Sequence, residues 1–177
     1  MKYFFDTEFI EDGKTIDLIS IGIVAEDDRE YYACNDECDL SKASDWVRKN
    51  VIVHLPSKHP GINPGNHNVS PSVRQDILTW KIRETIAAEI TSFCLQTDKE
   101  IEFWAYYASY DWVAICQLWG RMLDLPKSFP MYCRDLKQEA DRLSVDLPKE
   151  IPTENEHHAL ADARWNKRAW EFLSRVC

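Results

Sequence analysis

Residues 3–10 of the chain read Tyr3-Phe4-Phe5-Asp6-Thr7-Glu8-Phe9-Ile10. Such a run of aromatic and β-branched residues is typical of a β-strand. Because successive side chains of a strand point to opposite faces, Asp6 and Glu8 lie on the same face. Two explanations fit this carboxylate pair. Either an edge strand turns an acidic face to water, or the pair holds a divalent cation through hard oxygen ligands.

The next segments predict a three-stranded antiparallel meander. Residues 11–14 contain an Asp-Gly pair, which is typical of a turn. Residues 16–25 are apolar almost throughout, as in a strand buried on both faces of a central sheet. A turn at 27–28 then leads into a third strand over 29–34. Short turns of this kind join antiparallel neighbours.

The rest of the chain combines helices with one further strand. Apolar spacing predicts helical structure over 39–50, 72–97, 110–120, 135–143 and 159–176. A strand is predicted over 101–105, and a proline-rich irregular loop over 55–71. This order predicts an α/β fold with a mixed sheet, in a single domain spanning residues 1–177.

Composition limits the classes of function. The chain has 177 residues, 45% hydrophobic and 29% charged, with a formal net charge of −9. This globular composition excludes a disordered tail, a collagen and a coiled coil. A pI of about 5.0 argues against a domain that grips nucleic acid by bulk positive charge, although bound metal ions can supply such charge.

Cysteine usage and the absence of targeting signals indicate the compartment. No secretory signal and no span long enough to cross a bilayer is recognisable. The six cysteines are scattered, so we expect a cytoplasmic protein with reduced thiols. Cys34 and Cys38 would suggest a zinc site only with a second close pair, which the sequence lacks.

Three further polar residues stand where a site can form. Asp111 follows the 101–105 strand in the first turn of a helix, where it either caps the helix or contributes to a site at the strand end. Asp162 lies one turn into the last helix, and His157 and His158 precede that helix. Each histidine is either a surface residue or a site residue, and only one of the two can point inward.

Four carboxylates from separate segments suit a two-metal site. Two ions about 3.5–4 Å apart clamp the attacking and leaving oxygens of a displacement at phosphorus. Asp6 can bridge both ions, while Glu8, Asp111 and Asp162 divide the remaining coordination positions. His157 can then deprotonate the attacking water.

The ordered set Asp6-x-Glu8, Tyr110-Asp111 and His157-x-Ala159-Leu160-x-Asp162-Ala163 resembles the motifs of the DEDDh branch of DnaQ-like, ribonuclease-H-fold 3′–5′ exonucleases. Within that branch, the chain is most similar to small bacterial exoribonucleases of the mycobacterial exoribonuclease AS type. Each motif is weak alone, and their order, spacing and placement give the resemblance its strength. The resemblance runs from Tyr3 to about Leu173.

The resemblance implies a mixed five-stranded sheet flanked by helices, two Mg²⁺ or Mn²⁺ ions, and release of nucleoside 5′-monophosphates from a 3′ end. It carries over four metal ligands and a general base: Asp6, Glu8, Asp111, Asp162 and His157. Thr7 and Phe9 match positions that contact the terminal nucleotide. Tyr107 is the third expected substrate contact. Here the chain departs from the family pattern, because many relatives have His-Asn where this chain has Tyr106-Tyr107, and that asparagine commonly helps to hold substrate.

The expected substrate is single-stranded RNA at its 3′ end, or a short oligoribonucleotide. Lys58, His59 and His67 on the proline-rich loop, with Arg134, are candidates for phosphate contact. Two alternatives stay open at this point: a DNA-directed proofreading or repair exonuclease, and a non-catalytic nucleic-acid-binding module of the same fold. The resemblance also suggests a homodimer, and no membrane partner is expected.

Overall fold

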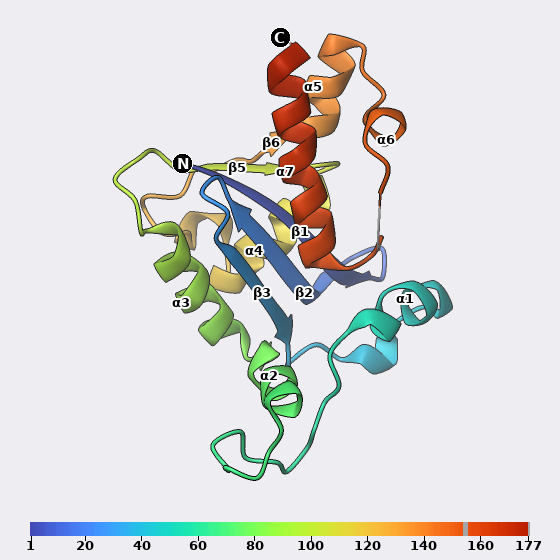
Figure 1. The fold of residues 1–177 in the computed structure, drawn as a ribbon, viewed down its shortest axis with the longest axis vertical. Coiled ribbons are helices and arrows are strands. Elements are labelled where there is room, and N and C mark those ends of the chain that lie inside the picture. Colours follow the sequence, from blue (N-terminus) through green and yellow to red (C-terminus); the bar gives the residue numbers. More distant parts are fainter. Residues whose placement is uncertain (154–155, 177) are drawn as a thin grey trace.

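A mixed six-stranded sheet forms the centre of the protein in the computed structural model, which describes residues 1–153 and 156–176 (Figure 1). The strand order is β4-β3-β2-β1-β5-β6. The strands are β1 (Lys2–Glu11), β2 (Ile16–Ala25), β3 (Glu30–Asn35), β4 (Trp80–Lys81), β5 (Glu102–Ala105) and β6 (Arg134–Asp135). The β1-β2-β3 meander is antiparallel, and the other pairings are parallel. The α/β prediction is confirmed.

Helices cover both faces of the sheet. They are α1 (Asp45–Asn50), α2 (Pro71–Thr79), α3 (Arg83–Cys94), α4 (Ser109–Cys116), α5 (Leu136–Leu143), α6 (Leu147–Glu150) and α7 (Ala159–Val176). Short 3₁₀ turns lie at Leu40–Lys42, Ile52–His54, Gln117–Trp119 and Met122–Asp124. Among the described residues, no helix is both long enough and apolar enough to cross a membrane.

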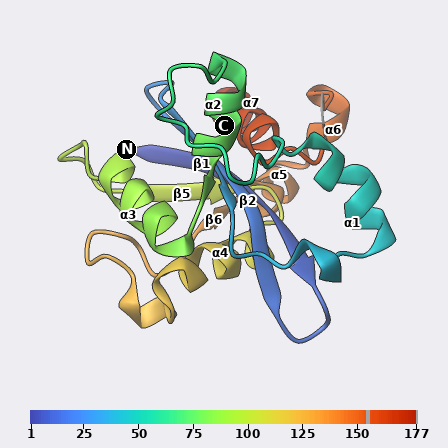
Figure 2. The same ribbon diagram turned by 90° about the horizontal axis from the view of Figure 1, so that it is seen from below.

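Alternation along β1 assigns the helices to their faces. Phe4 packs on Trp170 of α7, with ring centroids 5.7 Å apart, whereas Phe5 packs on Trp112 of α4, at 6.1 Å. Because consecutive strand residues point to opposite faces, α7 lies on one side of the sheet and α4 on the other. Figure 2 shows the same layering from below, with α3 and α4 on the side of the sheet away from α7. The main core fills the α3–α4 side.

The structure differs from the sequence prediction at the sheet edges. It has six strands where five were expected, because two-residue strands occupy both edges. The prediction of continuous helical structure over 72–97 was wrong, because β4 separates α2 from α3. Trp80 pairs with Cys34 of β3 and donates its indole N–H to the Pro56 carbonyl, 3.0 Å away. These partners are distant in sequence, so local periodicity does not show them.

Gly22 of β2 allows α7 to approach the sheet closely. A Cβ at this position would stand 2.4 Å from the Leu160 backbone and from the Ala159 carbonyl oxygen. The first turn of α7 therefore rests directly on the β2 backbone. In the sheet register Gly22 is opposite Asp6, so this contact sets the height of the α7 N-terminus beside Asp6.

We expect Gly22→Ala to destabilise the protein by about 1–3 kcal/mol, because the added methyl group meets backbone that cannot move without shifting the helix. Urea denaturation measures the loss. Gly65→Ala is the control, since its Cβ meets only the Asn63 side chain, and it should change stability by less than about 0.5 kcal/mol. Equal effects of the two substitutions would contradict the close-approach argument.

Candidate active site

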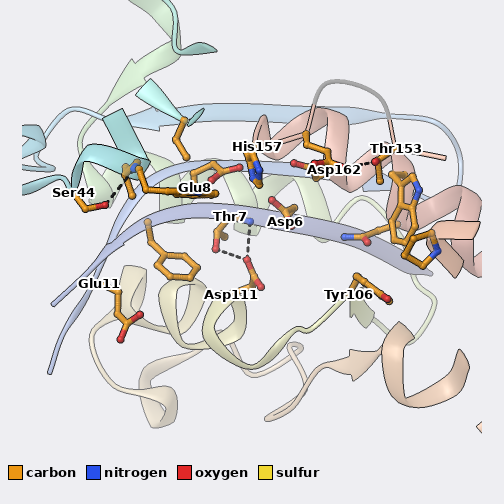
Figure 3. Close-up of a pocket in the computed structure, with 18 residues that line it drawn as sticks. Asp6, Thr7, Glu8, Glu11, Ser44, Tyr106, Asp111, Thr153, His157 and Asp162 are labelled. Carbon is orange, nitrogen blue, oxygen red and sulfur yellow. Dashed lines mark hydrogen bonds between the residues drawn. The ribbon is translucent and has the colours of Figure 1, made fainter. Parts of the chain in front are cut away.

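A pocket of about 500 Å³ opens where the second half of β1 meets the beginning of α7 (Figure 3). Its described lining residues include no lysine or arginine. Six of them are acidic: Asp6, Glu8, Glu11, Asp111, Glu156 and Asp162. So many carboxylates around one cavity repel one another strongly, and a bound cation is the usual means of offsetting that repulsion.

Three of the predicted carboxylates form a compact cluster. Oxygens of Asp6, Glu8 and Asp162 all lie within 4.8 Å of one another. Asp6 and Glu8 project from the same face of β1, as alternation predicts, while Asp162 enters from the first turn of α7. β1 lies between β2 and β5 in the strand order, but β5 pairs only with Lys2–Phe4, so at Asp6 and Glu8 the strand is paired with β2 alone. The pair nevertheless lines a pocket and does not form an open acidic face. An all-oxygen cluster of this kind fits Mg²⁺ or Mn²⁺.

Asp111 of α4 stands at the edge of β1, beside the cluster. Figure 3 shows the carboxylate of Asp111 against Thr7 of this strand. One oxygen of Asp111 accepts two hydrogen bonds, from the Thr7 backbone N–H at 2.9 Å and from the Thr7 hydroxyl at 2.7 Å. Asp111 lines the same pocket. Thr7, predicted as a substrate contact, therefore also anchors Asp111.

The two histidines occupy different environments. His157 lines the pocket, with a backbone φ of 67° in the left-handed region that histidine tolerates better than most residues. His158 instead caps α7: its Nδ1 accepts a hydrogen bond from the Ala161 N–H at 3.4 Å, and its own N–H donates to Asp162 Oδ2 at 3.2 Å. Of the pair, His157 is the one that reaches the cavity.

Trp46 of α1 forms part of the cavity wall beside His157. The two ring centroids are 4.8 Å apart, with the planes nearly perpendicular at 76°. Trp46 is 54% exposed, so it belongs to the surface of the pocket and not to the core. Phe9, Val47 and Val51 line the same pocket. Apolar residues thus stand close to the acidic cluster, an arrangement suited to a ligand with both a flat apolar ring and a charged group.

The electrostatics of the cluster follow from burial and like charge. Burial, with the negative charges of Asp111, Asp162 and Glu8, holds the pKa of Asp6 well above its usual range. Burial and the charges of Asp162 and Asp111 raise the pKa of Glu8 to about 8, and burial raises the pKa of Asp162 to about 6. Burial also raises the pKa of Asp111, against the Thr7 hydrogen bonds that lower it. The metal-free cluster therefore resists full ionisation.

Other residues predicted to contact substrate or phosphate do not line the pocket. Tyr107 is 61% exposed and is not among the residues that line the pocket, whereas its neighbour Tyr106 is. Lys58 pairs with Asp36 at 2.7 Å, and no described pocket residue comes from the proline-rich loop. Arg134 pairs with Glu102 at the sheet edge. Whether Tyr107 touches substrate stays a prediction.

Sequence reasoning did not select Asn166, a buried pocket residue whose side-chain amide donates to the Phe5 carbonyl at 2.7 Å. This bond attaches α7 to β1 one residue before Asp6. The signal was present, because Asn166 follows Asp162 by four positions and so lies on the same helix face. Trp165, whose indole N–H donates to the Ile151 carbonyl, also lines the pocket and was not selected.

Comparison with known proteins gives a family for this arrangement. The model of the 3′–5′ exoribonuclease Rv2179c-like domain matches residues 1–174. The chain belongs to this family. Two relatives, 3′–5′ exoribonuclease Rv2179c of Mycobacterium tuberculosis H37Rv and 3′–5′ exoribonuclease MT2234.1 of strain CDC 1551, are each 41% identical over 176 residues, covering 98% of this chain and 94% of theirs. The resemblance inferred from the motifs is confirmed.

A solved structure supports the fold assignment. S. pombe Pop2p, in a form with Mg²⁺ and Mn²⁺ bound, superposes with a TM-score of 0.53 over 98% of this chain and 83% of its own, at 14% identity. Similarity at this level bears on the fold alone. The Rv2179c-like chain therefore has the ribonuclease-H-like architecture that its motifs predicted.

The raised carboxyl pKa values predict how stability depends on pH. Folded Glu8 and Asp162 hold protons up to about pH 8 and about pH 6, whereas the same groups in the unfolded chain release theirs near pH 4. Their contribution is fully present below pH 4 and is lost as pH rises to about 8. With chelator, we expect the Tm to fall by on the order of 5 °C between pH 5 and pH 8.5, and Mn²⁺ to reverse the fall.

Glu8→Gln should flatten this dependence, since the neutral amide has no charge to lose or gain. Glu84→Gln, at an exposed position on α3, is the matched control and should leave the slope unchanged. Differential scanning fluorimetry over the pH series, with chelator and with Mn²⁺, provides the measurement. A Glu8→Gln curve parallel to wild type would show that the pH dependence arises elsewhere.

Thr7→Val tests the anchoring of Asp111. The substitution keeps the β-branched shape and removes the hydroxyl that donates to Asp111, so we expect a loss of about 1.5–3 kcal/mol in the free energy of unfolding at neutral pH. Thr7→Ser retains the hydroxyl and should lose less than half as much. Equal losses in the two variants would assign the effect to packing. Urea titration at pH 7 distinguishes these outcomes.

Proposed function

We propose that this protein is a metal-dependent 3′–5′ exoribonuclease that releases nucleoside 5′-monophosphates from single-stranded RNA 3′ ends or short oligoribonucleotides. The observation that carries the proposal is the cluster of Asp6, Glu8 and Asp162, with oxygens within 4.8 Å, in a pocket without a lysine or arginine among its described residues. Membership of the Rv2179c-like exoribonuclease family supports the choice of RNA and of the 3′ end.

Four carboxylates would hold the cations: Asp6, Glu8, Asp162 and, from α4, Asp111. The chemistry of the donor set fits, because hard carboxylate oxygens suit Mg²⁺ and Mn²⁺. Two such ions, when bound, supply Lewis-acid stabilisation of the attacking and leaving oxygens at phosphorus. Both Thr7 hydrogen bonds go to the same oxygen of Asp111, Oδ1.

The protein's own residues orient the reaction. His157 reaches the pocket and acts as general base: an imidazole nitrogen takes the proton of the attacking water as the water oxygen bonds to phosphorus and the bond to the departing 3′-oxygen breaks. The ring of Trp46 restricts the His157 imidazole from one side. Phe9 and Trp46 offer apolar surface to the terminal base, and such stacking tolerates any sequence.

The assay uses 5′-labelled single-stranded RNA and the matching DNA, with Mg²⁺, Mn²⁺ or chelator. We expect a ladder of products shortened from the RNA 3′ end, and no shortening with chelator. The rate of shortening should fall at least about 1,000-fold in Asp162→Asn. His157→Ala should lower kcat by about 100- to 10,000-fold and leave Mn²⁺ binding intact. Glu150→Gln, an exposed change on α6, should behave as wild type.

Other results would redirect the assignment. Preferential shortening of DNA would support a proofreading or repair exonuclease, whose distinction from an RNase depends on contact with the 2′-hydroxyl. A folded protein that binds Mn²⁺ and cleaves neither substrate would be a non-catalytic module. The homodimer implied by the family resemblance belongs to the same proposal, and sedimentation velocity should then find a species of twice the chain mass.

A further inference from the structure

Three residues stand side by side across the meander beneath the α7 N-terminus. Asp6 of β1 is opposite Gly22 of β2, which is opposite Tyr32 of β3. Directly opposed residues of neighbouring strands project on the same face. Because Gly22 has no side chain, the first turn of α7 lies in the space between Asp6 and Tyr32. Asp6, a candidate metal ligand, flanks that turn on one side, and the aromatic ring of Tyr32 flanks it on the other.

Tyr32 contacts the residue that caps α7. Its ring stacks on the His158 imidazole, with centroids 4.8 Å apart and planes inclined by 24°. His158 in turn donates its backbone N–H to Asp162 Oδ2 and accepts the Ala161 N–H on Nδ1. His158 therefore takes part in both the ring stack and the helix cap. It is also bonded to Asp162, the carboxylate that α7 contributes to the cluster.

Tyr32 lies outside the cavity. It is not among the residues that line the pocket. Its hydroxyl lies 3.4 Å from the Cys34 thiol and near the Ser20 side chain. The pKa of Tyr32 is raised chiefly by burial, with a smaller effect of the Glu8 charge. The contact that links Tyr32 to His158 is made by the ring, and a phenylalanine would reproduce that contact.

We propose that Tyr32 is a positioning residue, whose ring holds His158 and thereby keeps Asp162 at metal-binding distance from Asp6 and Glu8. This inference rests on the proposed function. The physical need is clear from the cluster itself: carboxylates this close repel one another, so Asp162 moves away unless its helix turn is restrained. A restraint already present in the metal-free protein lowers the free-energy cost of assembling the ligands.

The test compares Tyr32→Leu with Tyr32→Phe. Tyr32→Leu removes the stacking ring, and we expect it to weaken Mn²⁺ binding at least about 10-fold, as loss of supporting contacts does at other metal sites. Its kcat at a fixed low Mn²⁺ concentration should fall about as much, with KM for RNA within about twofold of wild type. Tyr32→Phe keeps the ring and should remain within about twofold in each quantity. Calorimetric titration with Mn²⁺ is the primary measurement.

Tyr31→Leu is the matched control on the same strand. Tyr31 faces the other side of the sheet, where it packs on Phe93 and its hydroxyl donates to Glu89 at 2.9 Å. Its loss should lower the Tm and leave Mn²⁺ affinity within about twofold of wild type. The inference would be overturned by wild-type Mn²⁺ affinity in folded Tyr32→Leu, by equal weakening in Tyr31→Leu, or by an equally impaired Tyr32→Phe.

His158→Asn reaches the same stack from the other side and keeps the inference testable if Tyr32→Leu fails to fold. Asparagine retains an N-cap acceptor and lacks the ring, so we expect the same loss of Mn²⁺ affinity; wild-type affinity would overturn the inference. A separate result tests the proposed function. A wild-type protein that binds Mn²⁺ and cuts no RNA would remove the exoribonuclease assignment, while the Mn²⁺ affinities of the variants would still decide the role of Tyr32.

Discussion

The backbone contact between Gly22 and the first turn of α7 is the constraint on which the site depends. A helix laid on a sheet normally stands off by the length of the side chains between them, yet here a Cβ would stand 2.4 Å from the Leu160 backbone. That approach brings a carboxylate from the end of the chain to two carboxylates near its beginning. The Asn166 bond to the Phe5 carbonyl holds the next turn of α7 in place. Without this close approach the acidic residues would stay separate.

The same approach concentrates negative charge, and several interactions restrain the residues that carry it. Thr7 bonds Asp111 twice, and His158 bonds Asp162 and caps its helix. These hydrogen bonds hold the acidic side chains where mutual repulsion would spread them. The raised pKa values of Glu8 and Asp162 express the electrostatic cost that remains. The free energy of unfolding is lower as a result, and the ligands are already arranged before a cation binds, as is common at functional sites.

Local sequence patterns predicted the central elements well and the peripheral ones poorly. The strand expected over 16–25 and the helix over 159–176 have the observed bounds of β2 and α7, because a long apolar run and a long helical period are strong signals. The edge strand β4 was missed, since two residues carry no period and Trp80 becomes a strand residue only by pairing with Cys34. The sheet therefore has one strand more than the family resemblance implied.

The sequence alone determined which residue types form the cluster: the alternation of β1 placed Asp6 and Glu8 on one face, and the spacing of the motifs indicated Asp162 and Asp111. Tertiary structure decided how they are used. It assigned His157 to the pocket and His158 to the helix cap, and it brought Asp111 of α4 to the edge of β1 beside the other three. Neighbouring residues with the same side chain are indistinguishable by local preference, and only the packing of α7 against Gly22 and Tyr32 separates them.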